Sequence, residues 1–168
     1  MSTTLHAPTR ASLLRVVAMP TEAADAIRST RTDGYGNTAR VIVDDNGGSP
    51  CRHCLRKTTP GDTVLLSSYR PFANSTVYQE VGPIFVHADA CTRHDEEAGF
   101  PIDFSAQRMI LRPYDRNDDI YDAQRYAEAG TAQAVALELL ADPEVAYVHA
   151  RSFTRGCFLF RLERRERS

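Results

Sequence analysis

Short runs of branched and aromatic apolar residues recur along the chain, separated by clusters of turn-forming residues. Such runs, bounded by Gly, Pro, Asn or Asp, are typical of β-strands. The sequence therefore predicts about seven strands, and the run that begins at residue 107 is expected to stop near Pro113. The strands are drawn from residues 13–19, 40–43, 63–69, 82–88, 107–111, 120–126, 144–153 and 156–163.

Two short helices are expected among these strands. The first begins at Pro20, a residue that suits the first turn of a helix, and runs through Arg28. The second covers residues 131–141 and ends before Pro143. Because the helices do not alternate regularly with the strands, the pattern predicts an α+β fold with one largely antiparallel or mixed sheet.

The length of the chain and its ends define the expected organisation. A chain of 168 residues fits one domain, and we expect a flexible tail over residues 1–11 and a single domain over 12–168. The first residues contain no apolar stretch of signal-peptide length, and no apolar run approaches the roughly 20 residues that span a bilayer. The sequence therefore predicts a cytoplasmic protein with no membrane partner.

Three motif-like segments fail the structural context that their function requires. Residues 34–39 match a dinucleotide-binding glycine pattern, but a strand is expected to follow where a helix is needed. Residues 44–47 begin like a calcium loop but lack its closing Glu, so we expect a turn. Residues 155–160 resemble an RNA-binding strand, but Phe158 and Phe160 lie at the wrong positions and are expected to face the core. The formal net charge of −2, from 22 acidic and 20 basic residues, also argues against a nucleic-acid partner.

The cysteine and histidine residues offer a stronger signal. Cys51 and Cys54 form a C-x-x-C pair, and His87 and Cys91 form an H-x-x-x-C pair further along the chain. Three thiolates and one imidazole complete a tetrahedral ligand set for zinc, a borderline-soft ion. These four residues are therefore predicted to bind zinc.

Other interpretations of the cysteines stay open. In one alternative, Cys51 and Cys54 are free thiols in a turn and bind no metal, and His87 is an ordinary strand residue. A redox dithiol is a weaker interpretation, because no strand-to-helix setting surrounds the pair. His53 and His94 lie nearby as spare donors, and Cys157 is expected to be a small buried residue.

Polar side chains alternate with apolar ones on several predicted strands. Val148 and Ala150 are expected to face the core, which places Tyr147, His149 and Arg151 together on the opposite face. That face is either the solvent-exposed side of an antiparallel sheet or one wall of a ligand pocket. In a pocket, histidine would transfer protons and arginine would hold an anionic substrate.

The pocket interpretation names a larger set of residues. The candidate catalytic residues are Cys51, His87 and His149. The candidate ligand-binding residues are Arg52, Tyr69, Tyr147, Arg151 and Arg155. This interpretation predicts a small anionic molecule as the partner.

Several of these stretches together resemble a bacterial family known as domain of unknown function 1203. The resemblance rests on residues 50–55 (PCRHCL), 60–69 (PGDTVLLSSY), 82–87 (GPIFVH), 147–151 (YVHAR) and 155–157 (RGC). It extends over residues 13–162 and implies a single bacterial domain of about this size, with no established activity. The resemblance also implies that Cys51 and Arg52 follow the family's general pattern, and that zinc binding through Cys54 and His87 belongs to a subgroup.

Two functional hypotheses follow from the sequence. The first is a small-molecule enzyme or ligand-binding domain with an Arg/His/Tyr pocket for an anionic substrate. The second is a zinc-stabilised binding or interaction module without catalysis. The geometry of the four metal-ligand candidates and the grouping of the polar strand residues discriminate between them.

Overall fold

The fold is described from a computed structural model over residues 13–165. It contains eight strands and three helices, so the predicted α+β class is confirmed. In chain order the elements are β1 (Leu14–Val17), α1 (Thr21–Thr30), β2 (Arg40–Asp44), β3 (Asp62–Tyr69), β4 (Gly82–His87), α2 (Ile102–Ser105), β5 (Met109–Tyr114), β6 (Arg125–Ala127), α3 (Ala132–Leu140), β7 (Tyr147–Ser152) and β8 (Phe158–Arg164). The predicted tail over residues 1–11 lies outside the described residues.

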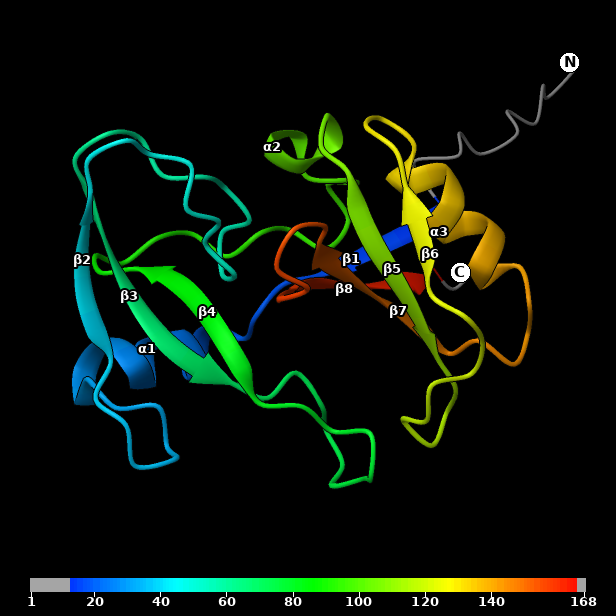
Figure 1. The fold of residues 1–168 in the computed structure, drawn as a ribbon, viewed down its shortest axis with the longest axis horizontal. Helices are drawn as coiled ribbons and strands as arrows, with labels where there is room; N and C mark the ends of the chain where they lie inside the picture. The colour runs from blue at the N-terminus through cyan, green and yellow to red at the C-terminus, as the bar shows by residue number, and fades with distance from the viewer. Residues whose placement is uncertain (1–12, 166–168) are drawn as a thin grey trace, which may run out of the picture.

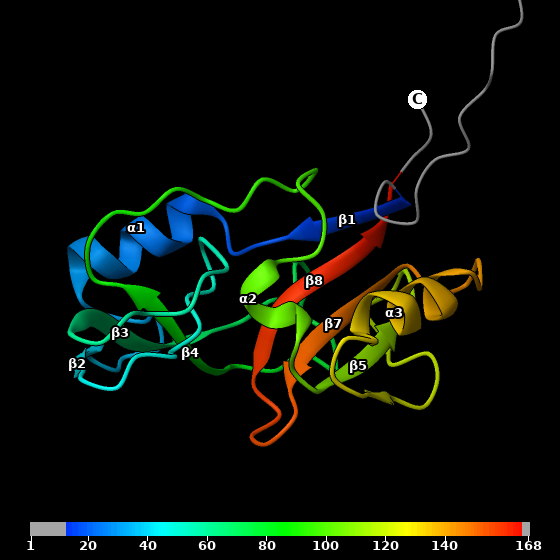
Figure 2. The ribbon, with the colours of Figure 1, turned by 90° about the horizontal axis from the view of Figure 1, so that it is seen from above.

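The strands form two antiparallel sheets, where the sequence pattern suggested one. The larger sheet has the order β1-β8-β7-β5-β6, and the smaller has the order β2-β3-β4. Figure 1 shows the two sheets side by side along the long axis, with α1 against the smaller sheet and α3 against the larger. Figure 2 shows β8 between β1 and β7, which makes β8 and β7 the centre of the larger sheet. None of the helices described is long and apolar enough to span a lipid bilayer.

Strand β5 continues through Pro113, beyond the end expected from the sequence. Pro113 lies opposite Val148 in β7. Its carbonyl oxygen accepts a hydrogen bond from the Tyr121 amide on the other side of the strand. In a strand the nitrogen and the oxygen of one residue point to the same side, so the proline nitrogen points away from β7. The missing N–H therefore costs the β5–β7 ladder no hydrogen bond.

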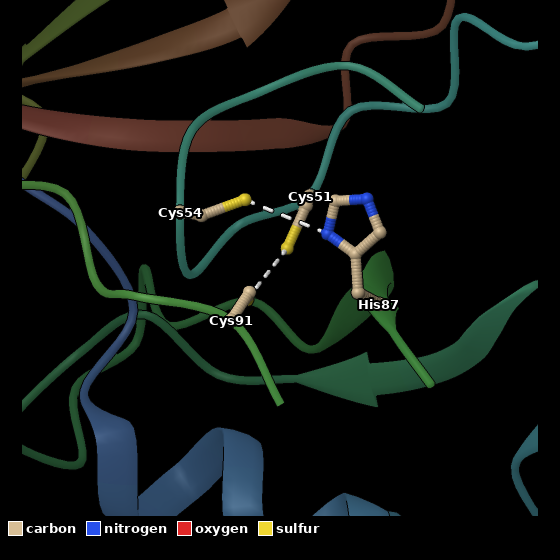
Figure 3. A group of neighbouring side chains, drawn as sticks. All are labelled: Cys51, Cys54, His87 and Cys91. Carbon is tan, nitrogen blue, oxygen red and sulfur yellow. Dashed lines mark hydrogen bonds between the residues drawn. The ribbon is translucent and has the colours of Figure 1, made fainter. Parts of the chain in front are cut away.

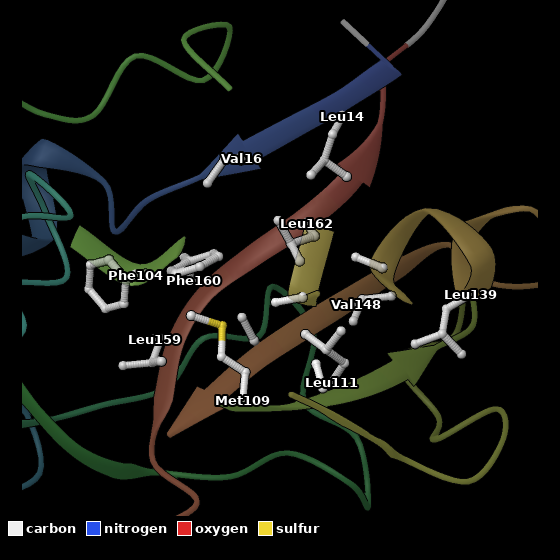
Figure 4. Close-up of a cluster of buried hydrophobic side chains, with 14 of the residues drawn as sticks. Leu14, Val16, Phe104, Met109, Leu111, Leu139, Val148, Leu159, Phe160 and Leu162 are labelled. Carbon is white, nitrogen blue, oxygen red and sulfur yellow. The ribbon is translucent and has the colours of Figure 1, made fainter. Parts of the chain in front are cut away.

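The larger core lies between the five-stranded sheet and helices α2 and α3 (Figure 4). Leu111, Val148 and Leu162 from neighbouring strands are fully buried against Leu139 and Leu140 of α3. The inward orientation predicted for Val148 and Ala150 is confirmed.

Helix α2 has only four residues and was not predicted from the sequence. It is held by one buried aromatic side chain, Phe104, whose ring packs edge-on against Phe160 at 5.4 Å between centroids. A single apolar residue gives no helical periodicity, so the sequence carried no signal for this element.

The smaller core is built mainly from small and medium-sized side chains. Ala24 and Ile27 of α1 pack on Leu65 and Val86 of the three-stranded sheet, with Cys51 buried beside them. It contains fewer buried residues than the larger core. Hydrophobic burial therefore stabilises this part of the molecule less than the rest.

Two of the three rejected motifs, at residues 34–39 and 44–47, are turns, as predicted. No helix follows the glycines at positions 34 and 36. These glycines lie in a turn between Thr32 and Thr38, which pair in an isolated antiparallel bridge. At the end of β2 the Gly47 amide donates to the Asp44 carbonyl at 3.2 Å, which closes a turn.

Candidate functional site

Four predicted metal ligands from three segments of the chain converge in the smaller half of the molecule. Cys51 and Cys54 lie in the connection between β2 and β3, His87 ends β4, and Cys91 follows in the next loop. Their ligand atoms all lie within 4.8 Å of one another, and Figure 3 shows their side chains pointing toward a common centre. The grouping predicted from the sequence is therefore present, and the four residues could hold a metal ion.

The distances within this cluster match those of a tetrahedral centre. Cys51 Sγ lies 4.0 Å from Cys91 Sγ, and Cys54 Sγ lies 3.5 Å from His87 Nδ1. A zinc–sulfur bond of about 2.3 Å places two ligands of a tetrahedron about 3.8 Å apart. The four side chains would thus enclose an ion without large rearrangement, and together they fill all four positions.

A tight turn brings the two cysteines of the C-x-x-C pair together. The Leu55 amide donates to the Cys51 carbonyl at 3.1 Å, and Leu55 adopts a left-handed conformation with φ of 52°. That conformation costs a non-glycine residue about 1–2 kcal/mol. The fully buried Leu55 side chain anchors it in the larger core. The turn is further fixed by a bridge between Cys51 and Phe85, two residues before His87.

Two further side chains contact Cys91: Arg28, to which the sequence assigned no role, and His53, which it named as a spare donor. Arg28 of α1 donates from Nη2 to Cys91 Sγ at 3.2 Å and from Nε to the His87 carbonyl at 3.0 Å. His53 Nδ1 lies 3.1 Å from Cys91 Sγ, and its Nε2 lies 3.0 Å from Thr21 Oγ1. With three thiolates and a divalent ion the centre would carry one negative charge, which the Arg28 guanidinium would offset.

His94, the other spare donor, lies away from the cluster. Its Nε2 is 3.2 Å from the carbonyl oxygen of Gly99.

Contacts within the cluster shift the pKa values of Cys51, Cys54 and His87. Hydrogen bonds from Cys54 and Cys91 hold the pKa of the Cys51 thiol well below its usual range. The pKa of Cys54 is raised, because its proton is shared with Cys51. Hydrogen bonds to Cys51 and Cys91 raise the pKa of His87 to about 10. These directions favour loss of the Cys51 proton and protonation of His87, and a bound divalent ion would displace the protons that remain on its ligands.

A cleft of about 940 Å³ lies between the two sheets, beside the C-x-x-C turn. Its walls come from the three-stranded sheet, the connection between β2 and β3, the two residues before β5, and the hairpin between β7 and β8. Its lining residues include Arg40, Arg52, Lys57, Arg108 and Arg155, together with Phe85, Phe153 and Cys157. No Asp or Glu is among them.

Arg52 connects the cluster to this cleft. It lies between the two cysteines of the turn, and its side chain is buried with 3% exposure. Its Nε donates to the Phe158 carbonyl at 2.7 Å and its Nη1 to the Pro50 carbonyl at 2.5 Å. Burial lowers the pKa of Arg52 to about 10, so the guanidinium keeps its charge at neutral pH.

Comparison with known proteins gives a family and no function. Residues 48–164, which include the four metal-ligand candidates and Arg52, match the family described as Protein of unknown function (DUF1203). The chain belongs to this family. No curated protein and no solved structure matches the chain. The resemblance identified from the sequence motifs is thus confirmed.

The polar strand residues predicted to form one pocket are divided between different places. Tyr69 and Arg151 line a smaller cavity of about 270 Å³, and Arg155 lines both this cavity and the larger cleft. His87 lies in the metal-ligand cluster. Arg151 donates to Glu80 Oε2 at 2.5 Å and to the Gly156 carbonyl at 2.7 Å, so its charge is already paired.

His149 lies in the interior, where the sequence suggested either solvent exposure or a pocket wall. Its side chain is fully buried among the rings of Phe72, Tyr114, Tyr147 and Phe158, with ring centroids 4.8–5.1 Å away. Both ring nitrogens lack a hydrogen-bond partner in the described part of the chain. Burial, reinforced by nearby arginines, lowers the pKa of His149 well below its usual range, so the imidazole is neutral.

The solvent-facing alternative for this side of β7 is wrong. Tyr147 is 1% exposed, and its hydroxyl donates to Asp118 Oδ1 at 2.7 Å. The connection between β3 and β4 covers this side of the sheet, with Phe72 packed on His149 and Glu80 paired with Arg151. The covering segment comes from a distant part of the sequence, so strand alternation alone could not predict it.

Proposed function

We propose that this protein is a zinc-stabilised binding domain, in which Cys51, Cys54, His87 and Cys91 hold one structural zinc ion. The observation that carries the proposal is the convergence of these four ligand atoms within 4.8 Å, from three separate segments. Thiolate and imidazole ligands favour zinc over magnesium or calcium, which prefer oxygen. A set of four protein ligands leaves no position for a substrate, which supports a structural role over a catalytic one.

The position of the cluster supports the stabilising role. The cluster would connect the β2–β3 connection to the end of β4 and the following loop, beside the smaller core. A structural zinc ion in a small peptide domain contributes an apparent binding free energy of about 10–16 kcal/mol. Zinc would therefore stabilise the smaller half of the molecule, in which hydrophobic burial contributes less.

The binding role is supported by the cleft beside the cluster. The turn that carries two of the ligands also places Arg52 in the cleft wall, and the cleft carries basic but no acidic side chains. A small anionic molecule fits this lining better than a cation or a neutral polar ligand. The placement of His149 and His87 outside the cleft lining favours binding over proton-transfer catalysis.

Metal content tests the proposal. The full chain, purified without an affinity tag or chelator, is analysed by plasma mass spectrometry, and its free thiols are counted before and after chelation. We expect one zinc per chain, with three thiols protected until the metal is removed. The Cys54→Ala variant should lose zinc, whereas Cys157→Ala, which changes a cysteine outside the cluster, should retain it. Metal-free protein with four reactive thiols, and with no uptake of added zinc, would overturn the proposal.

A further inference from the structure

The cleft between the two sheets has a marked excess of positive charge. Among the described residues, Arg40 and Arg155 are exposed and form no ion pair. Arg108 pairs with Glu128, and its guanidinium lies 3.7 Å from the Phe153 ring centroid. With no acidic residue in the lining, these cations create a positive potential inside the cleft.

Arg52 supplies a buried cation to the same cleft. Its Nε and Nη1 donate to main-chain oxygens, so no carboxylate neutralises the guanidinium. The third nitrogen, Nη2, forms no hydrogen bond within residues 13–165, and it is not among the fully buried atoms. Because Arg52 lines the cleft, Nη2 is left as a donor that faces it. A buried cation that no carboxylate pairs with is costly, and an anion in the cleft would reduce that cost.

The main chain of the nearby glycine-containing loop does not add further donors. The amides of Gly47, Gly48 and Ser49 already donate to Asp44 or Thr58. This loop therefore offers no free amide to an anion, unlike a glycine-rich phosphate loop.

We propose that the cleft binds a small phosphate ester of nucleotide size, with Arg52 at its floor and Lys57 and Arg155 at its rim. Three arginines that form no ion pair within the described residues, Arg40, Arg52 and Arg155, suit a group with two negative charges better than a single carboxylate. The volume of about 940 Å³ exceeds what one phosphate requires. The half-buried rings of Phe85 and Phe153 provide an apolar surface for the remainder of the molecule.

The proposed phosphate site and the proposed zinc site meet in the turn formed by residues 51–54. Arg52 lies between the ligands Cys51 and Cys54, and its amide donates to the Phe85 carbonyl at 2.9 Å. Zinc would hold the turn that positions the guanidinium. This coupling rests on the proposed function, and it predicts that zinc removal weakens phosphate-ester binding. By linkage, a bound ester must raise the affinity of the chain for zinc by the same factor.

Calorimetric titration of the full chain as purified tests this inference. The probes are ADP and inorganic pyrophosphate, with adenosine as the uncharged comparison. We expect ADP to bind and adenosine to bind at least tenfold more weakly. Arg155→Ala and Lys57→Ala should each weaken ADP binding about tenfold, the loss typical of one charge-assisted contact. Arg116→Ala, which removes an exposed arginine outside the cleft, should leave the affinity unchanged.

The outcomes separate this inference from the proposed function, because zinc content is measured on the same samples. Zinc-loaded protein that binds neither ADP nor pyrophosphate would overturn the phosphate site and leave the zinc proposal standing. ADP binding that depends on Arg155 in a protein without zinc would support the phosphate site and overturn the zinc proposal. An equal loss in Arg155→Ala and Arg116→Ala, or tighter binding of an RNA oligomer than of ADP, would overturn a small-molecule site in this cleft.

Discussion

The Nε atom of Arg52 donates a 2.7 Å hydrogen bond to the main-chain oxygen of Phe158. This contact joins the turn that carries the metal-ligand cysteines to β8, a central strand of the larger sheet. The Arg52 amide also donates to Phe85 in the smaller sheet. One residue therefore connects both sheets and lines the cleft between them.

Removing this connection should destabilise the protein. In Arg52→Met the side-chain length is kept, but the carbonyl oxygens of Phe158 and Pro50 lose their donor. We expect the free energy of unfolding to fall by about 2–6 kcal/mol, since each of the two unsatisfied acceptors costs about 1–3 kcal/mol. Urea denaturation measures this change. Arg155→Ala removes an exposed arginine of the same cleft and should change stability by less than about 0.5 kcal/mol. If Arg52→Met and the parent protein have the same free energy of unfolding, the Arg52–Phe158 contact contributes nothing to stability.

Removal of the metal should affect the two sheets unequally. The proposed zinc ion holds segments around β3 and β4, whereas the larger sheet has its own core with α3. After chelation, we expect faster amide hydrogen exchange in β3 and β4, with β7 and β8 still protected. Hydrogen-exchange mass spectrometry resolves these segments. Uniform deprotection of both sheets, or no change in either, contradicts a stabilising role confined to the smaller half.

Arg28 should strengthen metal binding without being a ligand. It donates to Cys91 Sγ at 3.2 Å and brings a positive charge to a centre of net negative charge. Loss of such a partner typically lowers metal affinity about 10–100-fold, and we expect Arg28→Ala to do so. Competition with a colorimetric zinc chelator gives the affinity, and Arg116→Ala is the matched arginine control. An Arg28→Ala affinity equal to that of the control would show that the guanidinium contributes nothing to the centre.

The buried imidazole of His149 should make stability depend on pH. Its pKa is lowered in the folded state by burial and by Arg151, Arg161 and Arg112. In the unfolded chain it titrates near 6.5. Below that pH the unfolded state binds the extra proton, so this contribution to stability is complete above about pH 6.5 and falls as the pH falls.

The size of this effect can be isolated with a variant. The free energy of unfolding should decrease by up to about 1.4 kcal/mol per pH unit below pH 6.5 through this group alone. Denaturation of the parent protein and of His149→Gln between pH 7 and 5 gives the difference between the two slopes. A slope that is the same in both proteins would mean that His149 is protonated in the folded state.

The sequence predicted the metal-ligand set because its signal is local. Cys51 and Cys54 are close enough in sequence for one turn to present both thiols, and His87 and Cys91 leave the same strand end. Strand alternation likewise placed Val148 correctly in the core. Both features depend on the spacing of residues along the chain, which can be read from a single sequence.

The remaining features depend on contacts between distant segments. Arg28 reaches Cys91 only because α1 packs on the smaller sheet, and Phe72 reaches His149 only because the β3–β4 connection crosses β7. The division into two sheets also depends on strand pairing across the chain, which the apolar pattern does not specify. Residue spacing therefore located the cluster, and the tertiary fold determined what surrounds it.

X-ray absorption at the zinc edge tests the central claim most directly, because it reports the ligands of the ion itself. Measured on the full chain as purified, the spectrum should fit three sulfur atoms at about 2.3 Å and one nitrogen atom at about 2.0–2.1 Å. Cys91→Ser should replace one sulfur by a lighter atom, whereas Cys157→Ser should leave the spectrum unchanged. A coordination shell of nitrogen and oxygen alone would contradict a zinc centre at Cys51, Cys54, His87 and Cys91.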